Sequence, residues 1–468
     1  MNLKEFIQLS GPLFEAVQIS AIYSDGKTFV DSTPNSDPQE ILKAFELERD
    51  NPIFNLKAFI ESHFTLPPQI KDKSPHASSM KEYIEKMWPI LHRKMKAPSK
   101  WSTLISLPHP HIVPGGRFRE CFYWDSYFTA LGLPLPYIKE IVQNFAHLID
   151  LLGFIPNGNR VYFASRSQPP YFSFLLKLLY DRGEEDYAKS FLSHLEKEYL
   201  YWTNHQIPLN SYHDKLNIPR PEAYKRETEL ARTTDHPQFF QSLRAACASG
   251  WDFSSRWLAD QKSFATIQTL DLLPVDLNSL LYHLEETLYL FSGNNDYKIA
   301  ADRRKEALQT HFWKEGFFHD IHLSNKEPTP SKTLAAATPL FVGAATQKQA
   351  DCIAKKLEKS FLLPGGFVTS LTEGEHQWDM PNGWAPLQWI TIRGLLNYGH
   401  TDLALEGARR WLALNEKLFA VKGTLLEKYN VRDCTANVAR GEYAPQQGFG
   451  WTNGVAIALM ELINGSKY

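Results

Sequence analysis

The chain has 468 residues, of which 43% are hydrophobic and 22% are charged, a balance typical of a globular protein with a large core. It carries 50 Lys and Arg residues against 52 Asp and Glu residues, so a net charge of −2 provides no basic excess for binding a nucleic acid. No run of 18 apolar residues occurs, and we therefore expect no membrane span.

Length alone predicts about three domains, although closed toroids of this length often fold as one unit. The first ten residues include Lys4 and Glu5 and lack the apolar segment of a secretion signal, so we expect a cytoplasmic protein. The cysteines are widely spaced and form no CxxC pair, which favours free thiols over a disulfide framework or a zinc site. These cysteines are Cys121, Cys247, Cys352 and Cys434.

Residues 1–75 differ from the rest of the chain. Apolar and polar residues alternate between positions 17 and 21, and Asp25-Gly26 is a turn signal. We interpret 1–75 as an N-terminal arm with little regular structure that packs on a main body formed by 76–468, the two making a single structural unit. The prolines expected to interrupt regular structure are at positions 34, 38, 52, 67 and 68.

Beyond residue 80 the dominant pattern is helical. Between 138 and 152, apolar residues recur at spacings of three and four, which predicts an amphipathic helix. Strand signals are short and scattered. Ten or more helices joined by long irregular loops predict an all-α toroid or solenoid, and such loops usually carry function. The other helices are expected at about 81–96, 171–182, 187–202, 277–292, 297–313, 347–360, 386–399, 402–419 and 452–463.

The segments between these helices are dense in Gly, Pro, Trp and charged residues. Hydrolysis of a sugar acetal needs a proton for the leaving oxygen and an activated water or a nucleophile at the anomeric carbon, and two carboxyl groups supply both. Arg and Asn bind hydroxyl groups, while Trp faces cover the ring. The segments provide this set of side chains: PGGRFRECFYWD (114–125), IPNGNR (155–160), SRSQPP (165–170), PRPE (219–222), SGWDFSSRW (249–257), QWDMPNGWAP (377–386), LEKY (426–429), GEY (441–443) and GFGWTNG (448–454).

These motifs resemble those of the inverting trehalase family. PGGRFRECFYWDSY is similar to the family's first signature and QWDMPNGWAP to its second. GPLF, PNSDP, LLEKY and QGFGWTNG also match, so the resemblance extends in order from about Gly11 to Gly454. It implies an (α/α)6 toroid with long active-site loops and hydrolysis of α,α-trehalose to two glucose molecules with inversion. It further implies a small disaccharide as partner and neither cofactor nor metal ion; a monomer is favoured.

The resemblance also implies roles for single residues. Asp252, in SGWDFSS, matches the general acid, and Glu427, in LLEKY, matches the general base. In an inverting enzyme the two carboxyl groups are expected about 6.5–9.5 Å apart. Without the motif, a salt bridge with Lys428 would be the better interpretation of Glu427. The positions that match substrate-binding residues of the family are Arg117, Trp124, Asp125, Asn157, Arg166, Gln168, Arg220, Glu222, Gly250, Trp378 and Glu442.

Several of these residues are also compatible with a purely structural role. Trp124 and Trp378 could belong to the core, and Glu222 and Glu442 could lie behind the residues that contact the substrate. The remaining motif residues Arg119, Trp251 and Trp384 are expected to support the scaffold.

One segment departs from the family pattern. The family commonly has a glycine-rich run before GEY that closes over the site, whereas positions 433–441 here read DCTANVARG. Because glycine permits positive φ, its loss predicts a stiffer lid. This departure leaves a catalytically weak trehalose-binding or regulatory protein as one alternative, and a different (α/α)6 glucosidase is the other. The GxG at 448–450 has the wrong spacing for a dinucleotide loop, and no HExxH motif occurs.

Overall fold

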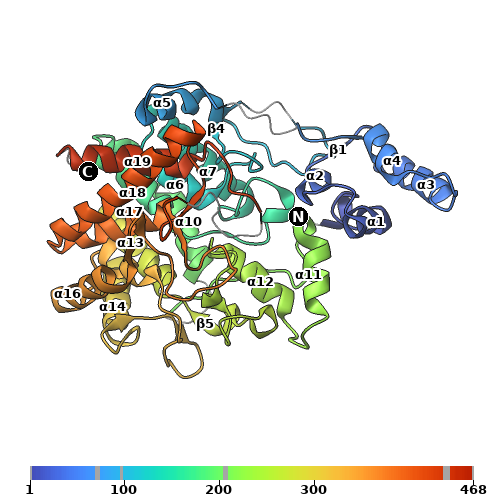
Figure 1. The fold of residues 1–468 in the computed structure, drawn as a ribbon. Helices are drawn as coiled ribbons and strands as arrows, with labels where there is room; N and C mark the ends of the chain where they lie inside the picture. Colours follow the sequence, from blue (N-terminus) through green and yellow to red (C-terminus); the bar gives the residue numbers. More distant parts are fainter. Residues whose placement is uncertain (1–2, 69–73, 95–97, 204–208, 436–442, 466–468) are drawn as a thin grey trace.

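The computed structural model describes residues 3–68, 74–94, 98–203, 209–435 and 443–465. Helices dominate this part of the chain, and none of its helices is both long and apolar enough to cross a membrane. The helices of the main body pack side by side (Figure 1), and the contacts between them form a ring that a second set of helices covers.

Among the described residues, six helices form the inner ring, and each contacts the next until the last returns to the first. The last inner helix contacts the first so closely at Gly454 that a Cβ there would overlap the carbonyl oxygen of Phe128. This position therefore needs glycine. The inner helices are buried on most of their faces, as expected for helices surrounded by other helices. In ring order they are α6 (Tyr123–Ala130), α8 (Phe172–Asp181), α13 (Val275–Ser292), α15 (Thr338–Phe341), α17 (Ala385–Asn397) and α19 (Gly450–Ile463).

An outer helix precedes each inner helix along the chain. The outer helices bury one apolar stripe and expose the other side, and α7 ends at Gly153 with a positive φ of 84°. This alternation is the predicted (α/α)6 toroid, and the fold prediction is confirmed. The outer helices are α5 (Met80–Leu91), α7 (Leu135–Leu152), α10 (Leu192–Thr203), α14 (Asn295–Thr310), α16 (Gln347–Lys356) and α18 (Thr401–Lys422).

Shorter elements lie in the connections. The segment between α10 and α13 contains α11 (Tyr224–Ala231) and α12 (Phe239–Ala248), and α9 (Glu185–Lys189) precedes α10. Single helical turns are η1 (Leu3–Glu5), η2 (Val161–Phe163), η3 (Pro221–Ala223), η4 (Ser255–Trp257), η5 (Phe264–Thr266), η6 (Thr269–Asp271), η7 (Leu334–Ala337) and the π-helical η8 (Leu357–Phe361).

The strands are short and pair two by two, always antiparallel. The pair β11–β12 matters for the site, because it joins the segment that contains QWDMPNGW to the segment that contains LEKY. The pairs are β1 (Thr33–Pro34) with β2 (Phe64–Thr65), β3 (His92–Arg93) with β4 (His111–Ile112), β5 (Leu272–Leu273) with β8 (Ile321–His322), β6 (Trp313–Lys314) with β7 (Phe317–Phe318), β9 (Leu362–Leu363) with β10 (Gly366–Phe367), and β11 (Asn382–Trp384) with β12 (Lys428–Asn430).

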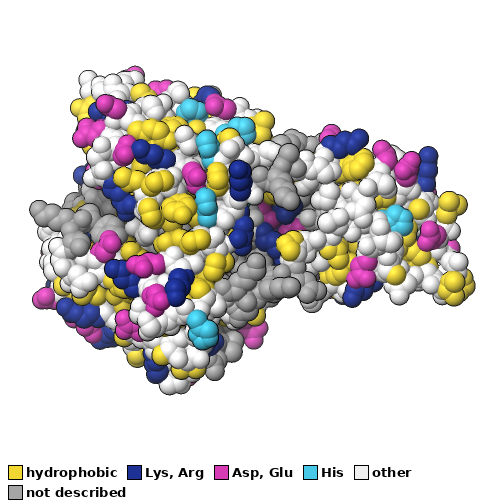
Figure 2. Space-filling view, turned by 90° about the horizontal axis from the view of Figure 1, so that it is seen from above, with side chains coloured by type: hydrophobic (Ala, Val, Ile, Leu, Met, Phe, Trp, Pro, Cys, Tyr) yellow, Lys and Arg dark blue, Asp and Glu magenta, His cyan; other side chains and the backbone are white. Residues whose placement is uncertain are grey.

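The N-terminal arm is more regular than expected. One of the prolines expected to interrupt regular structure, Pro38, instead opens a helix that the Asp37 side chain caps by accepting from the Gln39 amide. Helices α1 and α2 lie against the main body, whereas α3 and α4 project away from it as a lobe (Figures 1 and 2). The division at residue 75 stays a prediction. The arm helices are α1 (Pro12–Ser20), α2 (Lys27–Val30), α3 (Pro38–Glu48) and α4 (Leu56–His63).

His283 on α13 makes the stability of the fold dependent on pH. Its ring stacks on Phe174 with centroids 3.6 Å apart, and burial lowers its pKa to about 3. An unfolded histidine titrates near 6.5, so the unfolded chain takes up the proton first and stability is lost as pH falls from 6.5 toward 3. Between pH 7 and pH 5 we expect this residue to remove about 2 kcal/mol of unfolding free energy.

Urea unfolding at the two pH values measures the effect. His283→Gln should lose about 2 kcal/mol less between pH 7 and pH 5 than the unchanged protein does. His76→Gln, at an exposed position, is the matched control and should behave as the unchanged protein. Equal pH dependence in both variants would contradict this role of His283.

Candidate active site

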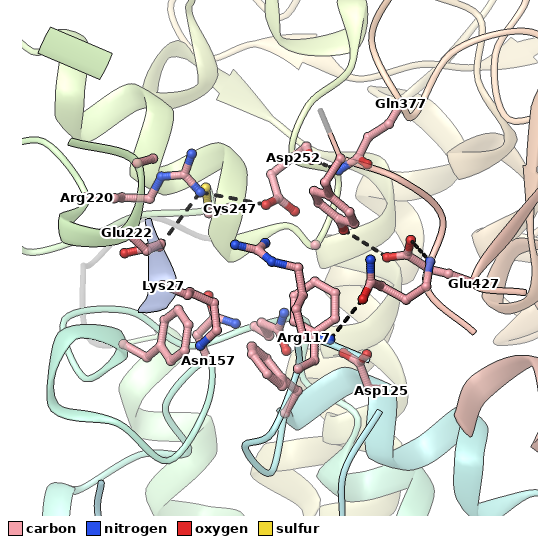
Figure 3. A pocket seen from close by; sticks show the side chains of 18 of the residues that line it. Lys27, Arg117, Asp125, Asn157, Arg220, Glu222, Cys247, Asp252, Gln377 and Glu427 are labelled. Atoms are coloured by element: carbon pink, nitrogen blue, oxygen red, sulfur yellow. Dashed lines mark hydrogen bonds and ion pairs between the residues drawn. The ribbon is translucent and has the colours of Figure 1, made fainter. Parts of the chain in front are cut away.

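A cavity of about 740 Å³ lies at the end of the toroid where the inner helices begin. Its walls come from residues 24–27 of the N-terminal arm and from the segments around the starts of α6, α8, α13, α17 and α19, and its volume is in the usual range for small-molecule sites. Within the described residues, every position predicted for the site lines this cavity. These are Arg117, Trp124, Asp125, Asn157, Arg166, Gln168, Arg220, Glu222, Gly250, Asp252, Trp378 and Glu427. Figure 3 labels Arg117, Asp125, Asn157, Arg220, Glu222, Asp252 and Glu427 among them.

Two predictions concern residues that lie outside the described part of the chain. Glu442 and most of the 433–441 lid segment fall in the gap at 436–442. The stiffer lid therefore stays a prediction.

Glu427 is held rigidly at the wall of the cavity. It directly precedes β12, which pairs with β11, and its backbone carbonyl accepts from the Trp451 indole at 2.9 Å. The side chain is only 1% exposed. Its Oε1 accepts from the Tyr443 hydroxyl at 2.8 Å, and its Oε2 accepts from the Lys428 ammonium at 2.9 Å. The Gln446 backbone amide also donates to Oε2, at 3.4 Å, so the carboxylate has two neutral donors and one cationic donor.

Glu427 therefore forms the salt bridge with Lys428 that its sequence neighbour suggested, and the same carboxylate also lines the cavity. The ammonium also donates to Gln377 Oε1 at 3.0 Å and lies 4.4 Å from the centroid of the Tyr443 ring. Because Lys428 is fully buried, its charge is compensated mainly by Glu427. The pair explains how a carboxylate can be kept in this buried position.

Asp252 has a different environment. It follows α12 in the SGWDFSS loop, its side chain is 37% exposed, and Oδ2 is 3.8 Å from Nη1 of Arg220. The side-chain amide of Gln377 donates to the Asp252 backbone carbonyl. Gly250 has a φ of 78°, and a Cβ there would be 2.6 Å from the Trp124 indole. The loop therefore needs glycine to pass beneath this ring.

Asp125 is a third carboxyl group at the cavity. It lies in the first turn of α6 and is buried. Burial raises its pKa well above the usual range, and the charges of Glu427 and Asp252 raise it further. Both effects disfavour the charged form of this carboxyl group.

Carboxylates outside the predicted set hold the three site arginines. Arg166 is 3.4 Å from Asp214 and also donates to Asn157 Oδ1 at 2.8 Å. The Arg220 backbone amide donates to Glu227 Oε2 at 2.7 Å, and its Nε bonds to the same carboxylate. Sequence reasoning missed both partners: Asp214 is 48 residues from Arg166, and Glu227, although only seven residues from Arg220, lies outside the motifs.

The third arginine is bound from the N-terminal arm. Arg117 donates to Asp25 through both Nε and Nη2, at 2.9 and 2.5 Å. Asp25 was expected only as part of a turn. No periodicity or motif linked it to position 117, which is 92 residues away.

Tryptophans form one side of the cavity. The rings of Trp378 and Trp384 stack at 3.9 Å, and Trp251 stacks on Trp378 from behind at 5.4 Å. Trp384 was expected to support the scaffold, yet it lines the cavity, whereas Trp251 does not. Arg119 also lies outside the lining and donates to the Pro68 carbonyl at 3.1 Å.

Further lining residues were missed although they lie inside or beside the motifs. Tyr443 ends the GEY motif and Gln377 begins QWDMPNGW, so their place in these motifs is the signal that could have found them. Cys247 lines the cavity, and all four cysteines are free. The described residues include no group of three or more His, Cys, Asp or Glu side chains that could hold a metal ion.

A family model described as Trehalase matches residues 21–464. The chain belongs to the trehalase family. Periplasmic trehalase from Salmonella paratyphi B is 41% identical to it over 490 residues, which cover 97% of this chain and 86% of that protein. Periplasmic trehalase from Citrobacter koseri is 40% identical over the same shares. This member of the trehalase family is a glycoside hydrolase.

Solved structures agree with this family. Neutral trehalase from Saccharomyces cerevisiae superposes with a TM-score of 0.65 and 26% identity over 80% of this chain and 77% of that chain. Mannosylglycerate hydrolase from Thermus thermophilus superposes with a TM-score of 0.55 and 17% identity over 81% of this chain and 100% of that chain. At that identity the second likeness shows the shared fold alone.

The cytoplasmic location predicted from the N-terminus is wrong. The relatives at 40–41% identity are named periplasmic trehalases, which points to the periplasm. The prediction rested only on the composition of the first ten residues, and an apolar secretion segment is not part of what folds. The residues that fold therefore carry little record of the compartment in which they work.

Proposed function

We propose that this trehalase-family enzyme hydrolyses α,α-trehalose to two glucose molecules in one step, with inversion at the attacked carbon. The observation that supports the proposal best is that Asp252 and Glu427 line one cavity in unlike environments. Asp252 is partly exposed beside Arg220, and Glu427 is buried beside a cation. Two carboxyl groups with different surroundings suit an acid and a base.

In the proposed reaction, protonated Asp252 gives its proton to the oxygen that bridges the two sugars. Ionised Glu427 removes a proton from a water molecule on the opposite face of the ring, and this water attacks the anomeric carbon as the bond to the bridging oxygen breaks. Attack inverts one centre, so the first products are one β-glucose and one α-glucose. Each carboxyl group finishes in the state of the other, and proton exchange with water restores them.

In this proposal the surrounding side chains orient the base and bind the sugar. The Lys428 ammonium and the Tyr443 hydroxyl orient Glu427 toward the water. The guanidinium groups of Arg117, Arg166 and Arg220 bind fixed sugar hydroxyls. Asp125 donates a hydrogen bond as a neutral acid, and the stacked indoles at Trp378 cover a ring face.

Glucose release from trehalose by the purified protein tests the function, and NMR during the first turnovers tests inversion. Equal initial amounts of α- and β-glucose are expected. Release of α-glucose alone would indicate retention. Faster cleavage of maltose than of trehalose would favour a different glucosidase, and binding without glucose release would favour a regulatory protein.

We also expect the reaction to need no metal ion. Activity after treatment with EDTA and dialysis should equal the untreated activity, because the proposed steps use side-chain carboxyl groups and water alone. Activity that EDTA abolishes and one particular divalent cation restores would refute this expectation.

A further inference from the structure

The N-terminal arm forms part of the cavity wall. Residues 24–27 line the same cavity as Asp252 and Glu427, although they come from outside the ring of helices. A separate hollow of about 250 Å³ lies between the arm and α11. It shares the lining residues Ser24, Gly26, Glu222, Ala223 and Arg226 with the main cavity. The arm therefore contributes to the site by direct contact.

The contact that matters most joins Asp25 to Arg117. Two nearly parallel hydrogen bonds, Nε to Oδ2 at 2.9 Å and Nη2 to Oδ1 at 2.5 Å, fix the plane of the guanidinium. Burial alone raises the pKa of Asp25, but its hydrogen bond and ion pair with Arg117 outweigh this and hold it below the usual range. Asp25 is thus a carboxylate at neutral pH. Arg117 lies over the Tyr443 ring, 5.0 Å from its centroid, beside the hydroxyl that bonds Glu427.

Asp25 is itself held in place by the loop around it. Its Oδ1 accepts from the Lys27 backbone amide at 2.9 Å. Gly26 approaches the main body so closely that a Cβ there would overlap the carbonyl oxygen of Glu222. Gln18 of α1 donates to the Pro221 carbonyl at 2.5 Å. The arm is therefore fitted against the segment that carries Arg220.

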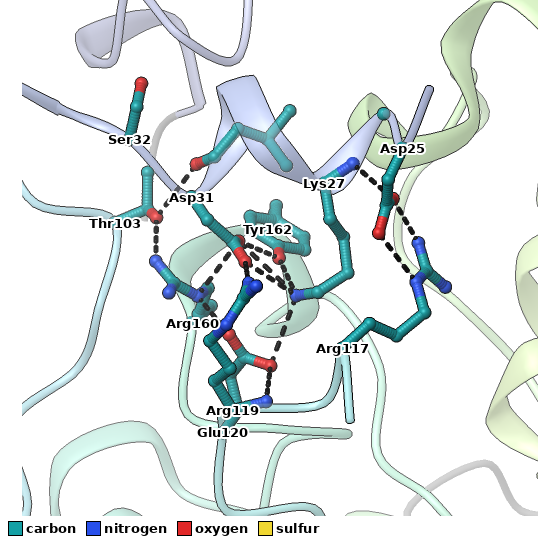
Figure 4. Close-up of polar contacts among 12 residues, drawn as sticks. Asp25, Lys27, Asp31, Ser32, Thr103, Arg117, Arg119, Glu120, Arg160 and Tyr162 are labelled. Carbon is teal, nitrogen blue, oxygen red and sulfur yellow. Dashed lines mark hydrogen bonds and ion pairs between the residues drawn. The ribbon is translucent and has the colours of Figure 1, made fainter. Parts of the chain in front are cut away.

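A buried cluster of charges fixes α2 to the main body (Figure 4). Lys27 bonds to Asp31 at 3.0 Å and to Glu120 at 3.1 Å. Arg160 bonds to Glu120 at 2.6 Å and to Asp31 at 3.1 Å. The Tyr162 hydroxyl donates to Asp31 at 2.7 Å. All four charged groups are buried, so displacing α2 would leave buried charges without partners.

We propose that Asp25 is a positioning residue for hydrolysis. It holds the Arg117 guanidinium at the cavity wall, so the N-terminal arm is needed for full activity. The inference rests on the proposed function, because it assigns Arg117 to substrate binding. Arg117 lies in a loop, and without the paired hydrogen bonds to Asp25 its long side chain would sample many rotamers. Fixing it in advance reduces the entropy lost when the sugar binds.

Asp25→Asn is the direct test, because asparagine keeps the shape and removes the charge and one acceptor. We expect kcat/KM for trehalose to fall about 10- to 100-fold, chiefly through KM, with an unchanged melting temperature. Asp37→Asn is the matched control, since it removes a carboxylate from the same arm at the exposed start of α3 and should retain full activity. Asp25→Glu, which keeps the charge, should lose less than Asp25→Asn.

A double-mutant cycle with Arg117→Lys separates positioning from general damage to the fold. If Asp25 acts through Arg117, Asp25→Asn should have little further effect in the Arg117→Lys background. Additive losses would overturn the inference, as would equal activity of Asp25→Asn and Asp37→Asn. If Asp25→Asn does not fold, the same cycle is measured with Asp25→Glu. An unchanged protein that releases no glucose from trehalose would instead refute the proposed function.

Discussion

Replacing either Asp252 or Glu427 by its amide should reduce kcat for trehalose by a factor between about 10² and 10⁴. Asp252→Asn should leave the stability unchanged, whereas Glu427→Gln also leaves the buried Lys428 ammonium unpaired and should fold with lower stability. Asp252→Asn removes the proton donor for the leaving sugar, and Glu427→Gln removes the acceptor for the proton of water. Initial rates of glucose release measure both losses. Glu358→Gln, at an exposed position on η8, is the matched control and should retain full activity.

The two roles separate with α-glucosyl fluoride as substrate, because fluoride leaves without a proton. Asp252→Asn should hydrolyse this substrate within about 10-fold of the unchanged enzyme, since acid catalysis contributes little there. Glu427→Gln should lose activity on both substrates, because water still needs a base. The reverse pattern would exchange the assigned roles, and near-normal cleavage of trehalose would remove that residue from catalysis.

Lys428→Met should reduce the free energy of unfolding by about 3–5 kcal/mol, because it leaves the buried Glu427 carboxylate without its cation. Activity should fall with it, since the same ammonium orients the proposed base and bonds to Gln377. Urea unfolding measures the stability, and glucose release measures the activity. Both partners are almost completely buried, so solvent screening is slight.

A second variant shows whether the loss comes from the unpaired charge. Glu427→Gln combined with Lys428→Met removes both charges and should recover a large part of the stability but none of the activity. Lys57→Met is the control, because its pair with Glu61 is exposed and contributes at most about 1 kcal/mol. If Lys428→Met is no more destabilising than Lys57→Met, Glu427 does not depend on this lysine.

Helical periodicity predicted most of the toroid because it reports which side of a helix is buried. All ten stretches with a repeat of three and four residues coincide with helices, from α5 to α19. Helix α6 was not predicted. All of its residues are buried, so it has no exposed polar side that would produce a helical repeat in the sequence. In the arm, Pro38 was expected to interrupt regular structure, yet it opens a helix, because proline is well tolerated in the first turn.

The sequence by itself determined the helical fold class, the trehalase family and the residues expected at the site, because these depend on local patterns and on long motifs. Only the tertiary structure decided which side chains hold those residues in place. Asp25 meets Arg117, and Tyr443 meets Glu427, because ring closure and arm docking bring distant segments into contact. A pattern of neighbours along the chain carries no information on such contacts, since their free energy depends on distance and burial in space.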